Sequence, residues 1–261
     1  MNRWTLTLAL GLLAASLGAT AEEGTAPVTG FLNKTLRHQD KDVRYVLYVP
    51  AGYDAAKPWP LVVFLHGAGE RGDDGLVQSE VGIGPAIKRN PDRFPCLVLM
   101  PQCPRDKFWD VMFDAIEGMM AQTRKDYTVD PARVYLTGLS MGGYATWLWG
   151  PLKTDTFAAF MPICGGGDPR DLKHLCGDMD LSRFGTMEER VAKLAPLPVW
   201  VFHGAKDDVV PPFRSRQMVN LLKKAGGTVK YTEFPDANHN SWDAAYGDAE
   251  SIAWLLAQRK K

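Results

Sequence analysis

A serine flanked by glycines is the residue in this sequence best suited to act as a nucleophile. It lies in Gly138-Leu139-Ser140-Met141-Gly142. A β-branched, apolar run at residues 134–137 precedes it, and residues 141–149 predict a buried helix directly after it. A serine on so tight a strand-to-helix turn exposes its hydroxyl, and the helix N-terminus attracts negative charge. We therefore predict acyl transfer through Ser140, the alternative being a glycine-rich turn with an idle serine.

A serine hydroxyl needs a general base at neutral pH, and the chain contains five histidines. His38 lies before the expected sheet, and His174 lies in a glycine-rich segment. His66 and His203 each precede a glycine at the end of an expected strand. His239 lies between the last expected strand and the last expected helix, where this architecture places the base. His239 is therefore the predicted base, the alternative being an ordinary histidine on a surface loop.

The acid of such a triad should lie between the serine and the histidine in chain order. A turn after the expected strand at residues 198–202 contains Asp207 and Asp208. We predict that Asp207, the first on the turn, orients the histidine, while Asp208 caps the following segment. The simpler alternative for both is turn formation, in which aspartate is common.

Acyl transfer also requires hydrogen-bond donors for the oxyanion. The residue after the nucleophile supplies the Met141 N–H. The second donor should come from the loop after the expected strand at residues 61–65, which reads His66-Gly67-Ala68-Gly69. We predict the Ala68 N–H, because the flanking glycines leave its peptide free to turn inward. Glycine-rich loops also follow strands in many folds without hydrolytic activity.

Apolar runs alternate with amphipathic ones along the chain, which predicts an α/β fold with a mostly parallel sheet and helices on both faces. A single catalytic domain is expected over residues 22–261. A glycine-rich, charged stretch at residues 165–195 could form a lid or a plain surface excursion. Strands are expected at residues 43–49, 61–65, 97–100, 134–137, 157–163, 198–202 and 229–234. Helices are expected at residues 110–126, 141–149, 213–225 and 244–258.

Five segments together carry a resemblance to a known family. They are residues 64–74, 101–104, 138–143, 164–168 and 239–243, which read FLHGAGERGDD, PQCP, GLSMGG, CGGGD and HNSWD. In these segments the chain resembles secreted bacterial α/β-hydrolases of the carboxylesterase, feruloyl-esterase-like and "predicted peptidase" group, which is related to dienelactone hydrolases. The similarity begins at about Phe31. It implies the α/β-hydrolase fold and an esterase for modest acyl groups on small molecules or polysaccharides.

One departure from that family concerns the substrate pocket. The segment Asp171–Thr186 looks longer than is usual, and this edge commonly shapes the pocket. Glu70, Trp109 and Trp242 are predicted to line the pocket because they follow the oxyanion loop, the 101–104 loop and His239. The alternatives are that the tryptophans only pack in the core and that Glu70 pairs with Arg71 or a nearby lysine.

The N-terminus is typical of a secretory signal. Arg3 precedes an uncharged, apolar run from Trp4 to Leu17, and Ala19-Thr20-Ala21 fits a cleavage site. We expect a signal peptide at residues 1–21 and a secreted or periplasmic product without a stable membrane anchor. The alternative is a retained anchor, which the Ala- and Gly-rich centre and the lack of a following basic cluster disfavour.

Composition narrows the remaining functions. Thirty basic residues balance thirty acidic ones, so the charge gives no support for a nucleic-acid partner. No Cys/His spacing predicts a metal, and the proposed chemistry requires no cofactor. Cys96, Cys103, Cys164 and Cys176 could form disulfides after export, and Cys164–Cys176 is the favoured pair because flexible glycines separate them.

Overall fold

The computed structural model describes Met1 and residues 27–172 and 179–260. Its centre is an eight-stranded sheet in the order β1-β2-β4-β3-β5-β6-β7-β8. The pairs β1–β2 and β2–β4 are antiparallel, and the other neighbours are parallel. The strands are β1 Gly30–His38, β2 Lys41–Val49, β3 Trp59–Leu65, β4 Leu97–Pro101, β5 Val129–Leu139, β6 Ala159–Ile163, β7 Val199–Gly204 and β8 Val229–Phe234.

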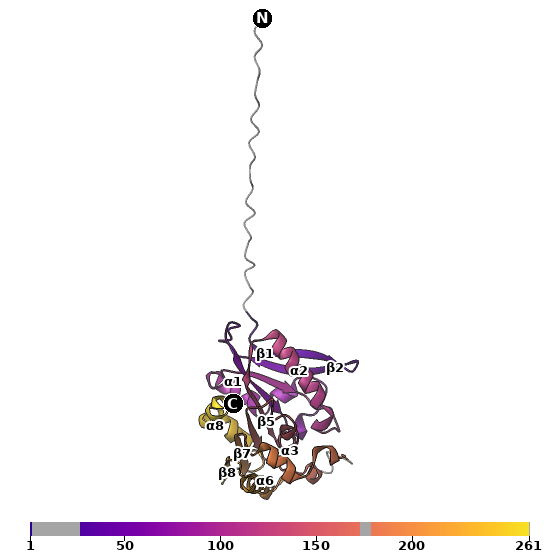
Figure 1. Ribbon diagram of the computed structural model, residues 1–261, viewed down its shortest axis with the longest axis vertical. Helices are drawn as coiled ribbons and strands as arrows, with labels where there is room; N and C mark the ends of the chain where they lie inside the picture. Colours follow the sequence, from indigo (N-terminus) through magenta and orange to yellow (C-terminus); the bar gives the residue numbers. More distant parts are fainter. Residues whose placement is uncertain (2–26, 173–178, 261) are drawn as a thin grey trace.

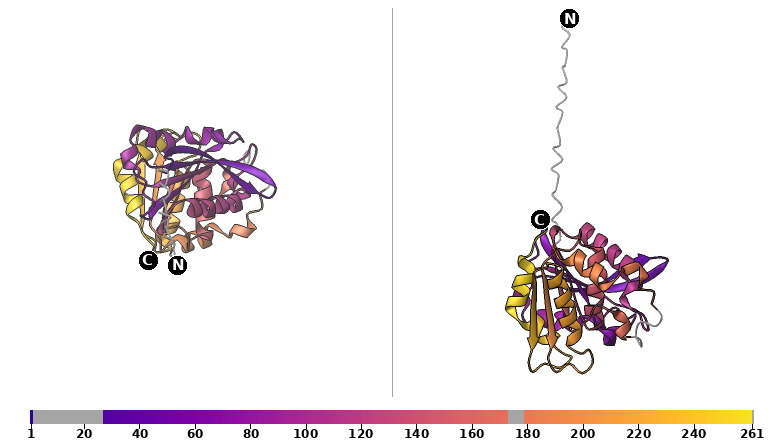
Figure 2. Two further views of the ribbon diagram at one scale, coloured as in Figure 1. Left: turned by 90° about the horizontal axis from the view of Figure 1, so that it is seen from above. Right: turned by 60° about the horizontal axis from the view of Figure 1, so that its bottom comes forward.

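Helices cover both faces of the sheet, as Figures 1 and 2 show. Apolar side chains of α2 Phe113–Asp126, α3 Met141–Trp149, α5 Met187–Leu194 and α6 Phe213–Lys224 belong to one core cluster. Those of α1 Ile83–Arg89, α7 Trp242–Gly247 and α8 Ala249–Ala257 belong to the second. The fold is therefore the expected α/β-hydrolase architecture, a mostly parallel sheet between two helical layers.

The central strands are apolar throughout because both of their faces are covered. In β3, Leu61, Val63 and Leu65 point into the first core, while Val62 and Phe64 point into the second. This alternation follows from the two-residue period of a strand. Each parallel strand in this region ends at the same edge of the sheet, so the loops after β3, β4, β5, β6 and β7 lie close together.

The elements differ from the sequence expectations mainly at the periphery. β1, α1 and α5 were not expected, and His38 is the last residue of β1 instead of lying before the sheet. The expected final helix at residues 244–258 is two helices, α7 and α8. The expected helix breaks at Asp248, where the backbone is extended. The Asp248 side chain caps α8 by accepting hydrogen bonds from Glu250 N and Ser251 N.

The favoured disulfide is absent from the structure. Cys164 is a buried free thiol, as is Cys96, and Cys176 lies outside the described residues. The pairing of Cys164 with Cys176 was therefore wrong for this structure, because Cys164 instead packs beneath the nucleophile. The expected signal peptide at residues 1–21 also lies outside the described part, apart from Met1. Over the residues described, no helix is sufficiently long and apolar to span a bilayer.

Candidate active site

Ser140 occupies a strained turn between β5 and α3. Its φ is 51° and its ψ is −116°, a conformation that residues with a side chain rarely adopt. The two glycines of the motif make the turn sterically possible. A Cβ on Gly138 would overlap the Gly142 carbonyl, and one on Gly142 would overlap the carbonyl of Leu65 at the end of β3. The local sequence therefore holds the serine hydroxyl above the carboxyl edge of the sheet.

The three predicted triad residues lie in one chain of hydrogen bonds. His239 Nε2 is 3.0 Å from Ser140 Oγ, and His239 Nδ1 is 2.8 Å from Asp207 Oδ2. The carboxylate can only accept, so Nδ1 carries the proton and Nε2 is free to accept the serine hydroxyl. This tautomer is the one that a general base requires.

Asp207 is held by donors on both of its oxygens. Oδ1 accepts hydrogen bonds from the N–H groups of Val209 (3.0 Å) and Val210 (2.8 Å). Burial favours the neutral acid, but the N–H donors of His203, His239 and Val210 outweigh it and hold the pKa of Asp207 far below its usual range. The carboxylate is therefore ionised wherever the protein is folded at ordinary pH. Asp208 is exposed and takes no part in this contact.

A buried thiol lies directly beneath these residues. Cys164 Sγ accepts a hydrogen bond from Ser140 N at 3.3 Å, and an Asp207 oxygen and a His239 nitrogen lie within 4.8 Å of it and of each other. Burial raises the pKa of the thiol, so it is protonated. The sequence did not indicate this grouping. Its acid and imidazole already bind each other, which favours the predicted triad over a metal site.

His66 organises the predicted oxyanion loop. Its Nε2 accepts the Cys103 N–H at 2.9 Å, so the proton lies on Nδ1, which donates to Gly67 O at 2.6 Å. The carbonyl and N–H of a trans peptide point in opposite directions, so this bond turns the Ala68 N–H away from His66. The ring is fully buried, and burial lowers the pKa of His66 to about 4. It is therefore a neutral structural donor.

Glu70 lies near the serine across Gly67. A Cβ on Gly67 would be 3.2 Å from Glu70 Oε2 and 3.7 Å from Ser140 Cβ. Burial raises the pKa of Glu70, opposed by hydrogen bonds from the backbone of Gly67 and of Glu70 itself. Arg71 does not pair with it, since Arg71 Nε donates to Ala68 O at 3.0 Å. The position is compatible with the predicted pocket contact.

The two tryptophans predicted to line the pocket differ. Trp242 is half-buried, and its ring meets that of His239 edge to face with centroids 5.4 Å apart. Trp109 is 0% exposed, packs against the His66 ring and donates its Nε1–H to His66 O at 3.2 Å. This burial does not fit a direct contact between Trp109 and substrate. Trp109 instead packs against His66 and so supports the predicted oxyanion loop from within the core.

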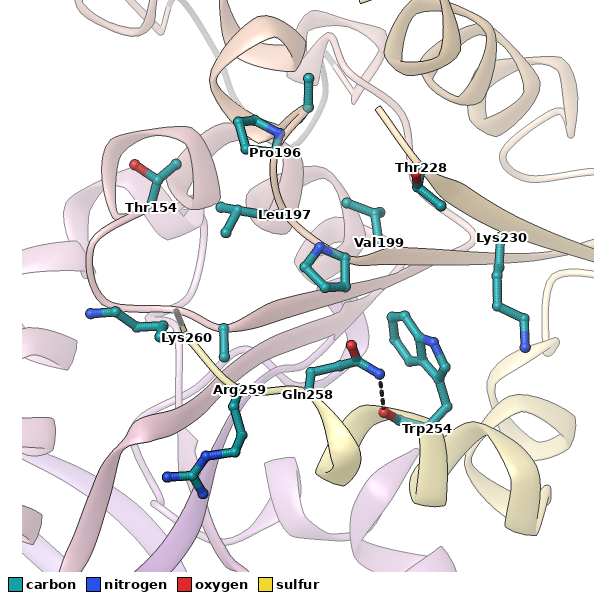
Figure 3. A pocket seen from close by; sticks show the side chains of 13 residues that line it. Thr154, Pro196, Leu197, Val199, Thr228, Lys230, Trp254, Gln258, Arg259 and Lys260 are labelled. Carbon is teal, nitrogen blue, oxygen red and sulfur yellow. Dashed lines mark hydrogen bonds between the residues drawn. The ribbon is translucent and has the colours of Figure 1, made fainter. Parts of the chain in front are cut away.

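A large cavity lies elsewhere in the described part of the chain. It has a volume of about 600 Å³ at the amino end of β7 and β8, next to the chain's last described residues. Figure 3 shows Trp254, Pro196 and Lys230 around it, together with the C-terminal residues Gln258 to Lys260. Ser140 lies at the opposite edge of the sheet, and the cavity contains no serine–histidine pair. We therefore do not assign it to the chemistry.

Sequence reasoning missed the roles of three buried residues. His66 and His203 were recognised only as strand-end histidines, and Cys164 only as half of a disulfide. The shared His-Gly signal at the ends of β3 and β7 could have marked both histidines as residues at the carboxyl edge. Their partners lie in the loops after β4 and β7 and in α6, however, and a single sequence does not specify how these fold onto the two rings.

Comparison with known proteins gives matches to hydrolases. Residues 178–260 match the prolyl oligopeptidase family, a region that includes the predicted acid and base but not the serine. An uncharacterized peptidase YuxL from Bacillus subtilis is 30% identical over 149 residues, or 49% of this chain. Poly(3-hydroxyalkanoate) depolymerase C from Paucimonas lemoignei is 28% identical over 43% of the chain. The chain spans only 22% and 30% of the lengths of these two relatives.

Solved structures share most of the fold. A thermostable esterase has a TM-score of 0.72 and 34% identity, with coverage of 88% of this chain and 63% of the esterase. A ferulic acid esterase from Anaeromyces mucronatus has a TM-score of 0.66, with 92% of this chain and 93% of that one covered. Its identity of 18% supports similarity of fold alone.

Proposed function

We propose that this chain, which has the α/β-hydrolase fold, is a serine hydrolase that cleaves carboxylic esters through Ser140, His239 and Asp207. The observation that carries the proposal is the continuous hydrogen-bond chain from Ser140 Oγ through both nitrogens of His239 to Asp207 Oδ2. The thermostable esterase, which is 34% identical, supports the same reaction class.

In the proposed mechanism, His239 Nε2 takes the Ser140 proton as Oγ attacks the ester carbonyl carbon. The tetrahedral oxyanion accepts hydrogen bonds from the N–H groups of Ala68 and Met141. Met141 is the first residue of α3, where helical N–H groups have no partner within the helix. The imidazolium then protonates the leaving alcohol. Water attacks the acyl-enzyme by the same route in reverse and releases the acid and Ser140.

The substrate we propose is a small or polysaccharide-linked ester with a modest acyl group, such as an acetyl or feruloyl ester. The half-buried Trp242 beside His239 offers an aromatic contact next to the base. Export through a signal peptide at residues 1–21 would bring the enzyme to such substrates. The polyester depolymerase similarity makes hydroxyacyl esters a further class to include in a substrate panel.

Replacement of Ser140 tests the proposal directly. Ser140→Ala should lower kcat on a cleaved ester by about 10⁶-fold, as loss of the nucleophile does in other triads, while the circular dichroism spectrum stays that of the parent. A fluorophosphonate probe should label the parent on Ser140 and leave the variant unlabelled. Near-normal turnover by Ser140→Ala would show that another group is the nucleophile. Absence of label on the parent would favour a noncatalytic binding or scaffold protein instead.

A serine peptidase of the same fold is the second candidate, supported by the prolyl oligopeptidase match. Amide cleavage needs stronger protonation of the leaving group than ester cleavage does. The test is kcat/KM on an ester and an anilide with the same acyl group. We expect the ester to be strongly preferred, and a preference for the anilide would support the peptidase.

A further inference from the structure

A second buried histidine contacts the proposed triad acid. His203 lies in β7 and is 0% exposed. Its Nε2 is 3.1 Å from Asp207 Oδ2, the same oxygen that His239 Nδ1 contacts at 2.8 Å. The same Nε2 is also 2.8 Å from Val210 O. Both of these neighbours are acceptors, so Nε2 carries a proton; its hydrogen bond goes to Val210 O, and Asp207 Oδ2 is the second, longer contact.

The opposite side of the ring is also fixed. His203 Nδ1 is 2.7 Å from Ser215 Oγ, and Ser215 Oγ lies 2.9 Å from Gly165 O. Ser215 belongs to α6 and is fully buried. The imidazole therefore cannot rotate without losing a hydrogen bond at each end. The contact between His203 and Asp207 is therefore fixed by the way β7 and α6 pack together.

The charged groups around this ring leave Asp207 as its principal partner. Glu233 faces His203 across the β7–β8 ladder, but it is bound by Arg216 of α6 and by the hydroxyl of Tyr231. From the end of β6, the neighbouring group is the protonated thiol of Cys164. His239 approaches from the loop after β8. Among these groups, only Asp207 contacts both imidazoles.

We propose that His203 is a positioning residue that acts on the base His239 through the shared oxygen Asp207 Oδ2. This inference rests on the proposed function and extends it to a fourth side chain. The contact with the His203 N–H holds the carboxylate in the plane that His239 needs. It also draws negative charge away from the oxygen, so Asp207 stabilises the imidazolium less than it would alone. His203 thus fixes the base and keeps it from being protonated too readily.

Two amide substitutions separate this role from simple packing. The amide of Gln reaches the place of an imidazole Nε2, whereas the amide of Asn reaches only the place of Nδ1. His203→Gln therefore keeps a donor for Asp207, and His203→Asn keeps only the contact with Ser215. We expect His203→Asn to lower kcat about 10- to 100-fold, the loss of one N–H contact to a charged group, with little change in KM. The midpoint of the acid limb of kcat/KM should move to higher pH.

His203→Gln should come closer to the parent in both kcat and the midpoint. His38→Gln, at the end of β1, is the control for replacing a histidine far from the site. If both His203 variants lost stability and kcat to the same extent but kept the parent's midpoint, His203 would be a packing residue and the inference would be wrong.

A measurement without turnover separates this inference from the proposed function. In Ser140→Ala protein, nitrogen-15 NMR of the imidazoles reports which nitrogen of His203 carries a proton and at what pH His239 titrates. We expect a proton on His203 Nε2, and a higher titration midpoint for His239 once His203→Asn is added. A proton on Nδ1 alone would overturn the inference even if the Asn variant did not fold. An inactive, unlabelled parent would overturn only the proposed function.

Discussion

Asp207 and Asp208 are neighbours in sequence with opposite environments. The Asp207 carboxylate is buried and contacts His239, whereas Asp208 is exposed. Asp207→Asn should lower kcat by about 10⁴-fold, because an amide next to Nδ1 favours the wrong imidazole tautomer. Asp208→Asn should leave kcat near that of the parent. Steady-state kinetics on one ester compares the two variants, and the reverse order of losses would make Asp208 the acid.

The burial of His66 predicts how the free energy of unfolding depends on pH. Its pKa is about 4 in the fold, against an ordinary value of 6.5. The unfolded chain therefore takes up a proton as pH falls below 6.5, while the folded protein does so only near pH 4. The free energy of unfolding should decrease across this window, by about 3 kcal/mol in total for this group. Above pH 6.5 this decrease is absent, and the contribution of neutral His66 to the free energy of unfolding is complete.

Urea unfolding of the parent and of His66→Asn between pH 4 and pH 7.5 measures this contribution. The Asn side chain can still donate to Gly67 O, but it does not titrate. As the pH falls, the free energy of unfolding of the parent should therefore decrease relative to that of the variant. A constant difference would mean that His66 is not buried as a neutral imidazole.

The proximity of Ser140, His239 and Asp207 could be predicted because each position depends on local signals. Ser140 has its glycines, and Asp207 and His239 each follow a strand in the required chain order. The contact of Cys164 with Ser140 could not be predicted, because it depends on which strand ends are neighbours. The contacts of His203 depend on how the loop after β7 and helix α6 fold back onto its ring. Cys164 meets Ser140 only because β6 pairs with β5 in one particular register. The burial of Trp109 depends likewise on how the loop after β4 folds over His66.

At the scale of elements, the buried strands and helices were predicted, whereas β1, α1 and α5 at the periphery were not. β3 and α3 are continuous apolar runs, so their signal is strong. β1 is an edge strand with many polar residues, and α1 contains Gly84 and Pro85 in its first turn. For α5 a signal was present and overlooked: Thr186 and Glu189 form a capping box.

The packing of the nucleophile turn against β3 makes a prediction for Gly142. An alanine Cβ there would overlap the Leu65 carbonyl, which cannot move without disrupting the sheet. Gly142→Ala should therefore lower the free energy of unfolding by on the order of 3 kcal/mol and abolish ester cleavage. Gly52→Ala is the control, because nothing lies within 4 Å of its added Cβ. Thermal unfolding compares them, and equal Tm values would contradict the close packing of this turn.

At the scale of the whole molecule, the candidate active site and the cavity lie at opposite edges of the sheet. The strained serine, the two buried histidines His66 and His203, and the predicted oxyanion loop all lie at the carboxyl edge. The amino edge contains the 600 Å³ cavity, where Lys230 pairs with Glu250 and Arg259 with Asp130. The six residues of β7 separate these edges by about 20 Å. A substrate bound at Ser140 therefore does not reach the cavity.

Filling the cavity tests this separation. Thr228 lines it and is exposed, so a tryptophan at this position can enter the space without displacing the core. Thr228→Trp should leave kcat/KM for the preferred ester, and labelling of Ser140 by a fluorophosphonate, at parent levels. Thermal unfolding should show a native fold. A rise in KM with unchanged kcat would contradict the assignment, because uniform loss of binding would place part of the substrate at the amino edge of the sheet.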